Sequence, residues 1–156
     1  GVFYPIQSFT KGKALANPII PIAIEGSNEK TIVALEFLAK SISSSVFQYN
    51  SKQRKTLHLA AVFANNFTNH LLLQSKRILE KEKMDFAVLK PLLEETLHKV
   101  FAIGPESAQT GPAKRGDAKI ISQHLDYLRN EPELYQLYEL ITSQISKVHR
   151  DREVNE

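Results

Sequence analysis

Residues 51–83 read SKQRKTLHLAAVFANNFTNHLLLQSKRILEKEK and predict one long helix. Ser51 is a residue type that caps helix starts, and neither proline nor glycine interrupts the stretch. The middle of the stretch is apolar on most sides, which is more apolar surface than one domain of this size needs to bury. This stretch decides the fold, because no strand pattern appears after it.

One stripe of this helix is polar in an unusual way. At about 100° of rotation per residue, a narrow stripe collects His58, Val62, Asn65 and Asn69, with Asn66 at its side. A stripe that faces solvent usually carries Lys and Glu, whereas imidazole and amide groups suit hydrogen bonding to a ligand or to buried backbone. Two interpretations stay open, a ligand site and a satisfied polar seam between helices.

Further helices follow the long one. We expect them at Phe86–Ile103, at Ala118–Arg129 with Asp117 as the cap, and from Pro132 to about Val148. Pro91 lies inside the first of these, so that helix is either kinked or begins at Pro91. The end of the chain, residues 149–156, is charged and is expected to fray from residue 151.

The loop at residues 109–117, QTGPAKRGD, is the second informative element. It combines glycine, a hydroxyl group and basic side chains, so Thr110, Arg115 and backbone N–H groups could contact an anionic group. A plain connector between helices explains the same composition, and both interpretations remain open.

The first 49 residues have a different character. They predict strands at 1–4, 19–24 and 46–49, a loop at 10–18, and a helix that is capped by Ser27 and ends near Ile42. This α/β fragment is too small to cover both faces of a sheet, and Gly1 opens directly on an apolar run. We therefore expect the sequence to begin inside a domain.

The fold class that follows is α+β. Residues 1–49 would be the last part of a nucleotide-binding α/β domain, residues 50–150 a mostly helical domain of the kind that dimerises, and residues 151–156 a frayed tail.

Composition argues against several function classes. The 156 residues are 42% hydrophobic and 24% charged, as in a globular protein that buries a core. A net charge of +3 spread along the chain is not the clustered charge of a nucleic-acid binder, and no apolar run is long enough to cross a membrane. Cysteine is absent, which fits a reducing, cytoplasmic compartment, and scattered histidines predict no metal site. The sequence contains no Gly-x-Gly-x-x-Gly and no P-loop.

Two motifs carry a resemblance to a known family. HLAAVFANNF at 58–67 and QTGPAKRGD at 109–117 resemble the DUF2520 C-terminal domain. This domain follows a Rossmann domain in proteins assigned as NADP oxidoreductases, which are related to pyrroline-5-carboxylate reductase and to coenzyme F420-dependent NADP oxidoreductases. The opening GVFYPIQSF at 1–9 is similar to the last stretch of the family's Rossmann domain.

The resemblance implies a helical domain that mediates dimers and a substrate cleft between it and the nucleotide domain. Carried over to this sequence, it implies catalytic roles for His58 and Asn66. It implies substrate binding by Thr110, Gly111 and Arg115, and we expect Asn65 and Gln7 to join them. Many members have histidine at the position of Tyr4, and a tyrosine there can donate a hydrogen bond but cannot shuttle protons near neutral pH.

The function that we expect is that of the C-terminal, substrate-binding and dimerising part of an NAD(P)-dependent oxidoreductase acting on a small molecule. NADP would bind the full-length protein and not this chain tightly, because the Gly-rich turn that holds pyrophosphate is missing. The chain alone would be inactive and would form a homodimer without nucleic-acid or membrane partners. The alternatives are a non-catalytic dimerisation or ligand-sensing module and, more weakly, a basic nucleic-acid module.

Overall fold

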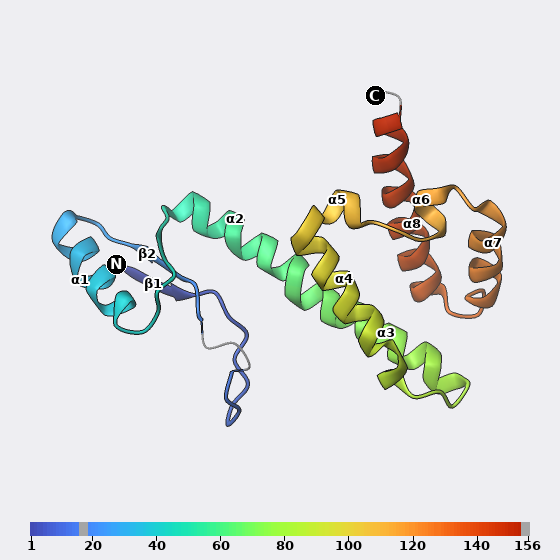
Figure 1. Cartoon of the computed structure of the whole chain (residues 1–156), viewed down its shortest axis with the longest axis horizontal. Helices are drawn as coiled ribbons and strands as arrows, with labels where there is room; N and C mark the ends of the chain where they lie inside the picture. The colour runs from blue at the N-terminus through green and yellow to red at the C-terminus, as the bar shows by residue number, and fades with distance from the viewer. Residues whose placement is uncertain (16–18, 154–156) are drawn as a thin grey trace. The chain divides into compact units, whose positions relative to one another are not determined.

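The computed structural model describes residues 1–15 and 19–153, with side chains described as far as residue 150. The chain divides into two compact units, Gly1–Leu73 and Gln74–Glu156. The first begins with a small sheet, and helices make up most of the rest (Figure 1), so the α+β class is confirmed. No helix in the described ranges is both long and apolar enough to span a membrane.

Three strands form the sheet in the order β1 (Val2–Pro5), β2 (Ile22–Glu25) and β3 (Val46–Gln48). Strand β1 runs antiparallel to β2, and β3 runs parallel to it. The strands lie where the sequence predicts them, except that β2 begins at Ile22 and not at Ile19. Pro21 explains the later start, because proline has no N–H to donate to a strand ladder. Residues 16–18 of the predicted loop lie outside the described residues.

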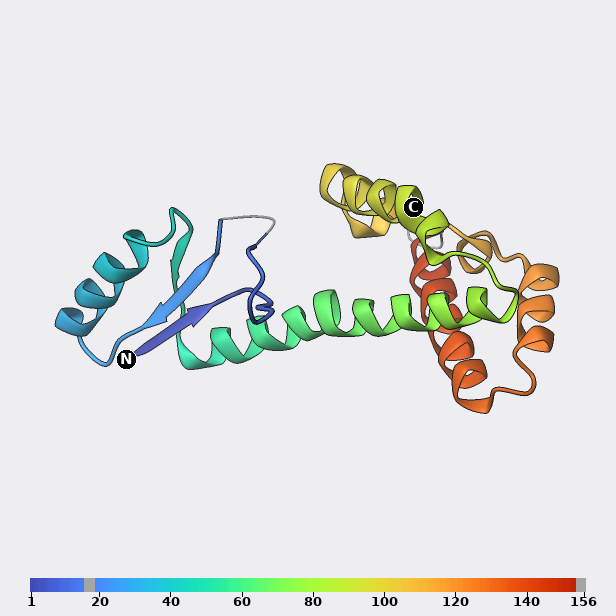
Figure 2. The ribbon, with the colours of Figure 1, turned by 90° about the horizontal axis from the view of Figure 1, so that it is seen from below.

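Helix α1 (Glu29–Lys40) lies along one side of the strands, as Figure 2 shows. The buried core between them contains Ile22, Ile24 and Ala39, with Phe3 packed at its margin. The prediction that Ser27 caps this helix is wrong by one position. Asn28 caps the helix, since its side-chain oxygen accepts a hydrogen bond of 2.9 Å from the backbone N–H of Thr31.

Strand alternation places Tyr4 on the other face of the sheet. Tyr4 follows Phe3, which packs toward α1, and neighbouring residues of a strand point to opposite faces. Tyr4 pairs in register with Ala23, whose small side chain is 1% exposed.

The predicted long helix is present from Ser51 to Lys81, in three consecutive segments. They are α2 (Ser51–Ala61), the π-helical segment η1 (Val62–Phe67) and α3 (Thr68–Lys81). Its cap is Asn50 rather than Ser51, because Asn50 and Gln53 form a reciprocal capping box. The sequence pattern does not predict the π-helical turn.

The remaining helices follow the predicted order. They are the 3-10 segment η2 (Phe86–Leu89), α4 (Lys90–Ile103), α5 (Pro105–Ala108), α6 (Pro112–Arg115), α7 (Ala118–Tyr127) and α8 (Pro132–Glu153). Pro91 lies in the first turn of α4, where a missing N–H costs nothing, so the helix begins beside it. Gly104 ends α4 with a φ of 81°. The backbone of α8 continues past the predicted end at Val148, and the tail residues 154–156 lie outside the described residues.

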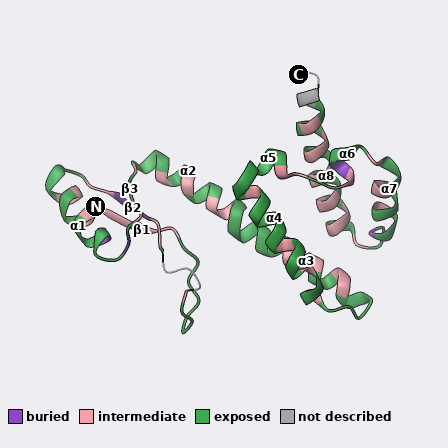
Figure 3. Ribbon diagram, viewed as in Figure 1, coloured by how far each residue is buried: buried purple, intermediate pink, exposed green. Residues whose placement is uncertain are grey.

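Helices α6, α7 and α8 pack around a small centre in the second unit. Ala113 and Leu128 are buried there, and the Ser146 hydroxyl on α8 donates a hydrogen bond of 3.0 Å to the Ala113 carbonyl on α6. By contrast, Figure 3 colours the long helix and α4 as intermediate or exposed throughout, and no residue of α2, η1, α3 or α4 is buried.

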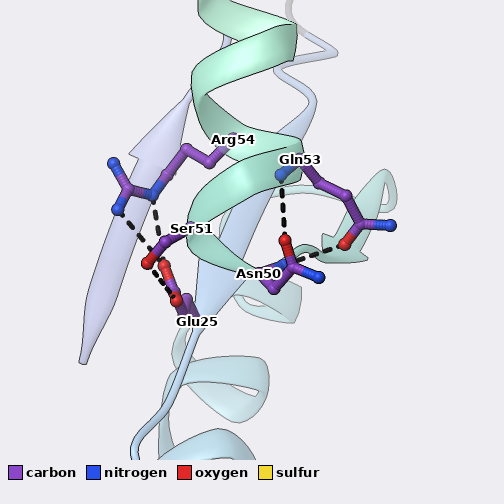
Figure 4. A network of polar contacts seen from close by, with 5 residues as sticks. All are labelled: Glu25, Asn50, Ser51, Gln53 and Arg54. Atoms are coloured by element: carbon purple, nitrogen blue, oxygen red, sulfur yellow. Dashed lines mark hydrogen bonds and ion pairs between the residues drawn. The ribbon is translucent and has the colours of Figure 1, made fainter.

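One polar cluster joins the sheet to the long helix (Figure 4). The carboxylate of Glu25, the last residue of β2, accepts a hydrogen bond of 2.6 Å from the Ser51 hydroxyl. It also accepts hydrogen bonds of 3.3 and 3.2 Å from the Arg54 guanidinium. The hydrogen bond from Ser51 is the main cause that lowers the pKa of Glu25, and Arg54 lowers it further, while partial burial acts in the opposite direction. The first turn of α2 is thereby fixed to the end of β2.

The lowered pKa predicts how this contact responds to pH. Because the folded pKa of Glu25 is below its unfolded value, the contact stabilises the fold above the unfolded pKa, about 4.3 for an ordinary glutamate. That stabilisation is lost as pH falls through the lowered, folded pKa. In urea unfolding, Glu25→Gln should be less stable than the original chain at pH 7, and the difference should shrink steadily below about pH 4.

A matched substitution serves as the control. Glu36→Gln removes a carboxylate from an exposed pair with Lys40 on α1, and exposed pairs of this kind contribute little to stability. A difference for Glu25→Gln that is no larger than that of Glu36→Gln, or that is unchanged at low pH, would contradict the role of this cluster.

Candidate functional site

A tyrosine of β1 and a histidine of α2 meet beside the polar cluster. The Tyr4 hydroxyl lies 3.0 Å from Nδ1 of His58. The two rings meet edge to face, with their centroids 6.2 Å apart. These residues are far apart in the sequence, so the contact depends on how the first turns of α2 are held against the sheet.

A pocket of about 580 Å³ opens around this pair. Its lining comes from the end of β1, from the residues just after it, and from the α2 and η1 part of the long helix. The polar lining residues are Tyr4, Gln7, Ser8, His58, Asn65 and Asn66. The apolar ones include Ile6, Leu57 and Val62.

The π-helical turn explains why Asn66 reaches this pocket together with Asn65. In an ideal α-helix Asn66 lies to one side of the stripe that contains His58. A π-helix closes i→i+5 hydrogen bonds, so its wider turn advances each residue through a smaller angle. This smaller rotation moves Asn66 toward the His58 stripe. It also moves Asn65, which an ideal helix places within the stripe, toward the border of the stripe, where Asn65 still lines the pocket. Turns of this kind often occur at functional sites.

The pocket is an open groove rather than a closed cavity. Gln7, His58, Asn65 and Asn66 are each exposed, and Tyr4 is partly buried. Apart from His58, the lining holds no ionisable side chain other than the Tyr4 phenol, and it has neither lysine, arginine nor carboxylate. The groove thus presents amide, hydroxyl and imidazole groups, a composition suited to a small polar molecule with little net charge at this end.

The structure brings together four of the side chains that the sequence singles out: Gln7, His58, Asn65 and Asn66. Thr110, Gly111 and Arg115 belong to the second unit, between α5 and α7. There Gly111 has a φ of 101°, a left-handed conformation that favours glycine. Lys114 Nζ donates a hydrogen bond of 2.8 Å to the Gln109 carbonyl, and Asp117 caps α7 as predicted.

The sequence analysis assigns no site role to Tyr4, and it does not predict the hydrogen bonds that Glu25 accepts from Ser51 and Arg54. For Tyr4 a signal exists, because alternation along β1 places it opposite the core residue Phe3. For Glu25 no signal exists, since its partners Ser51 and Arg54 lie on a different element and resemble an ordinary solvated first turn. Among the described residues, no three histidine, aspartate or glutamate side chains gather as a metal site would require.

Comparison with known proteins gives one family and two informative structures. The family model described as a domain of unknown function, DUF2520, matches residues 20–145. A solved structure named "putative NADP oxidoreductase" from Bacteroides fragilis is 42% identical to this chain, with a TM-score of 0.90. The match covers 94% of this chain and 57% of the Bacteroides fragilis chain. The solved structure of a protein from Thermotoga maritima is 26% identical, with a TM-score of 0.76, and the match covers 97% of this chain and 62% of the Thermotoga maritima chain. No curated protein matches the chain.

Proposed function

The chain belongs to the DUF2520 family, and from that premise we propose that it is the substrate-binding and dimerising part of an NADP-linked oxidoreductase. The resemblance to the Bacteroides fragilis protein supports the reaction class. This chain spans a little over half of the length of that protein. The activity of the whole protein is therefore part of the proposal, as is its setting in the cytoplasm.

The observation that carries the proposal is the contact of Tyr4 with His58 inside the pocket. When bound, the nicotinamide cofactor would supply or accept a hydride. The protein must then bind the substrate and stabilise charge on the atom next to the reacting carbon. His58 suits that task, because its ring can donate a hydrogen bond to a carbonyl or an imine. Asn66 would orient the substrate through its amide.

The nucleotide itself would be held mainly by a part of the protein outside this chain. The pocket offers neutral groups that suit a nicotinamide ring and a small substrate, whereas pyrophosphate needs several backbone N–H groups at a helix start or a cluster of basic side chains. The pocket lining has no basic cluster of this kind.

A separate ligand contact is proposed for the loop between α5 and α7 of the second unit. The Thr110 side chain and Arg115 are exposed there, and they would bind an acidic group of a small molecule. Gly111 would allow the backbone to approach a ligand closely.

A non-catalytic ligand-sensing role is the second candidate. It is favoured by the tyrosine at position 4, because a phenol does not exchange protons near neutral pH as a second histidine would. A sensing role requires the same pocket but no turnover, so kinetics separates the two candidates.

We predict that His58→Ala lowers kcat/KM at least about 100-fold in the proposed two-domain protein, because a positioned donor is removed from the reacting atom. Asn66→Ala should act mainly on KM. The measurement is NADPH oxidation with a panel of small ketones and imines, and Asn69→Ala on the same helix, outside the pocket, is the matched control. Turnover that survives both pocket changes would refute the site, and binding without any turnover would favour the sensing role.

Dimerisation is the second part of the proposal, and an apolar stripe on the long helix supports it. Residues four apart share one face of a helix, and this stripe contains Leu59, Phe63, Phe67 and Leu71, which are 59%, 61%, 49% and 40% exposed. The Phe63 and Phe67 rings pack against each other edge to face, with their centroids 4.8 Å apart. A contiguous apolar stripe of this length is typical of an interface. We propose a second copy of the chain as its partner, since the same stripe on two long helices is self-complementary.

Sedimentation of the chain should show a dimer, and Phe63→Glu should weaken it at least about 100-fold, because a carboxylate would be buried without a partner. Lys52→Glu introduces the same group in the exposed first turn of α2 and should leave the dimer intact. A monomer at every concentration, or equal effects of the two substitutions, would rule out this interface.

A further inference from the structure

We propose that Tyr4 is a positioning residue that holds His58 in one tautomer, with the ring proton on Nε2, so that His58 presents an N–H donor to the pocket. The tautomer of His58 can be measured on this chain by itself, without a substrate or a cofactor. The role of the Nε2–H donor in binding a substrate rests on the proposed function.

The distance of 3.0 Å between the Tyr4 hydroxyl and Nδ1 of His58 requires one proton between them. A phenol O–H is the stronger donor of the two groups, and a bare imidazole nitrogen is the stronger acceptor. The arrangement with Tyr4 donating to Nδ1 is therefore favoured. A neutral imidazole carries only one proton, which then resides on Nε2.

The backbone around Tyr4 and His58 holds both side chains in place, which favours the hydrogen bond that selects the tautomer. Tyr4 lies on a strand that is paired in register with β2, and the first turn of α2 is fixed to the end of β2 by Glu25. The two rings also meet edge to face. Both partners are thus held by backbone structure, which reduces the entropy lost when the hydrogen bond forms.

The inferred tautomer restricts the chemistry of the ligand. With Nδ1 occupied by Tyr4, Nε2–H is the group that His58 offers to the pocket. The matching ligand atom must accept a hydrogen bond. A carbonyl oxygen does so without a proton of its own, whereas a hydroxyl accepts only when its own proton is turned to another partner. The reactant that Nε2–H of His58 matches best would accordingly be the oxidised partner of the reaction, the ketone or imine.

Nitrogen-15 NMR of the histidine side chains tests the proposal directly, because a protonated ring nitrogen and a bare one have well-separated chemical shifts. The spectrum is recorded on the labelled chain at about pH 8.5, two units above the ordinary imidazole pKa. We expect His58 to show a bare Nδ1 and a protonated Nε2, whereas the exposed His98 shows averaged shifts of mixed tautomers. In Tyr4→Phe the His58 shifts should move toward those of His98.

The chain offers a matched control in a second pair of the same kind. On α7 and α8, Nδ1 of His124 lies 2.8 Å from the Tyr138 hydroxyl. Tyr138→Phe should change the His124 signals and leave those of His58 in place, which separates loss of one hydroxyl from general disturbance of the fold.

Two results would overturn the proposal: a proton on Nδ1 of His58 in the original chain, or His58 shifts that Tyr4→Phe does not change. Neither result depends on turnover or on NADP. Failure of this inference is therefore distinguishable from failure of the proposed oxidoreductase function, which the kinetic experiment tests separately.

Discussion

The contact of Glu25 with Ser51 and Arg54 is the constraint on which the site depends. A helix that starts after a short strand could leave the sheet in many directions. A carboxylate at the end of β2 that accepts hydrogen bonds from two side chains of the first turn of α2 restricts that direction. The capping box of Asn50 and Gln53 fixes the helix start at the same place. Once the start is fixed, His58 falls two turns further along the helix, beside Tyr4.

The site then follows from two local deviations from regular structure. Strand β1 ends at Pro5 and the chain bends at Gln7, where Gln7 and Ser8 line the pocket. The π-helical turn at Val62–Phe67 rotates the two asparagines so that both line the same groove. The same turn lies under the apolar stripe that contains Phe63 and Phe67, so the pocket and the proposed dimer surface lie on one stretch of helix.

The sequence predicts the elements of this fold well and their details less well. The spacing of apolar residues and the lack of proline and glycine locate the long helix, periodicity and caps locate the helices after it, and β-branched runs locate the strands. Caps are harder: Ser27 and Asn28 are both good capping residues, and the sequence pattern does not decide between neighbours. The π-helical turn is not visible, since VFANNF has the composition of an ordinary helix. The grouping of His58 with Asn65 follows from spacing, whereas Asn66 joins them through the π-helical turn and Tyr4 through tertiary structure.

The central claim is that the groove beside Tyr4 and His58 holds the reacting end of a substrate against a nicotinamide ring. A crystal structure of the proposed two-domain protein with NADPH and a non-reacting ketone or imine analogue tests it most directly. The account predicts the nicotinamide ring at the mouth of this groove and the acceptor atom of the analogue within hydrogen-bond distance of Nε2 of His58. A nicotinamide ring bound against another face, with the groove filled only by water, would contradict it.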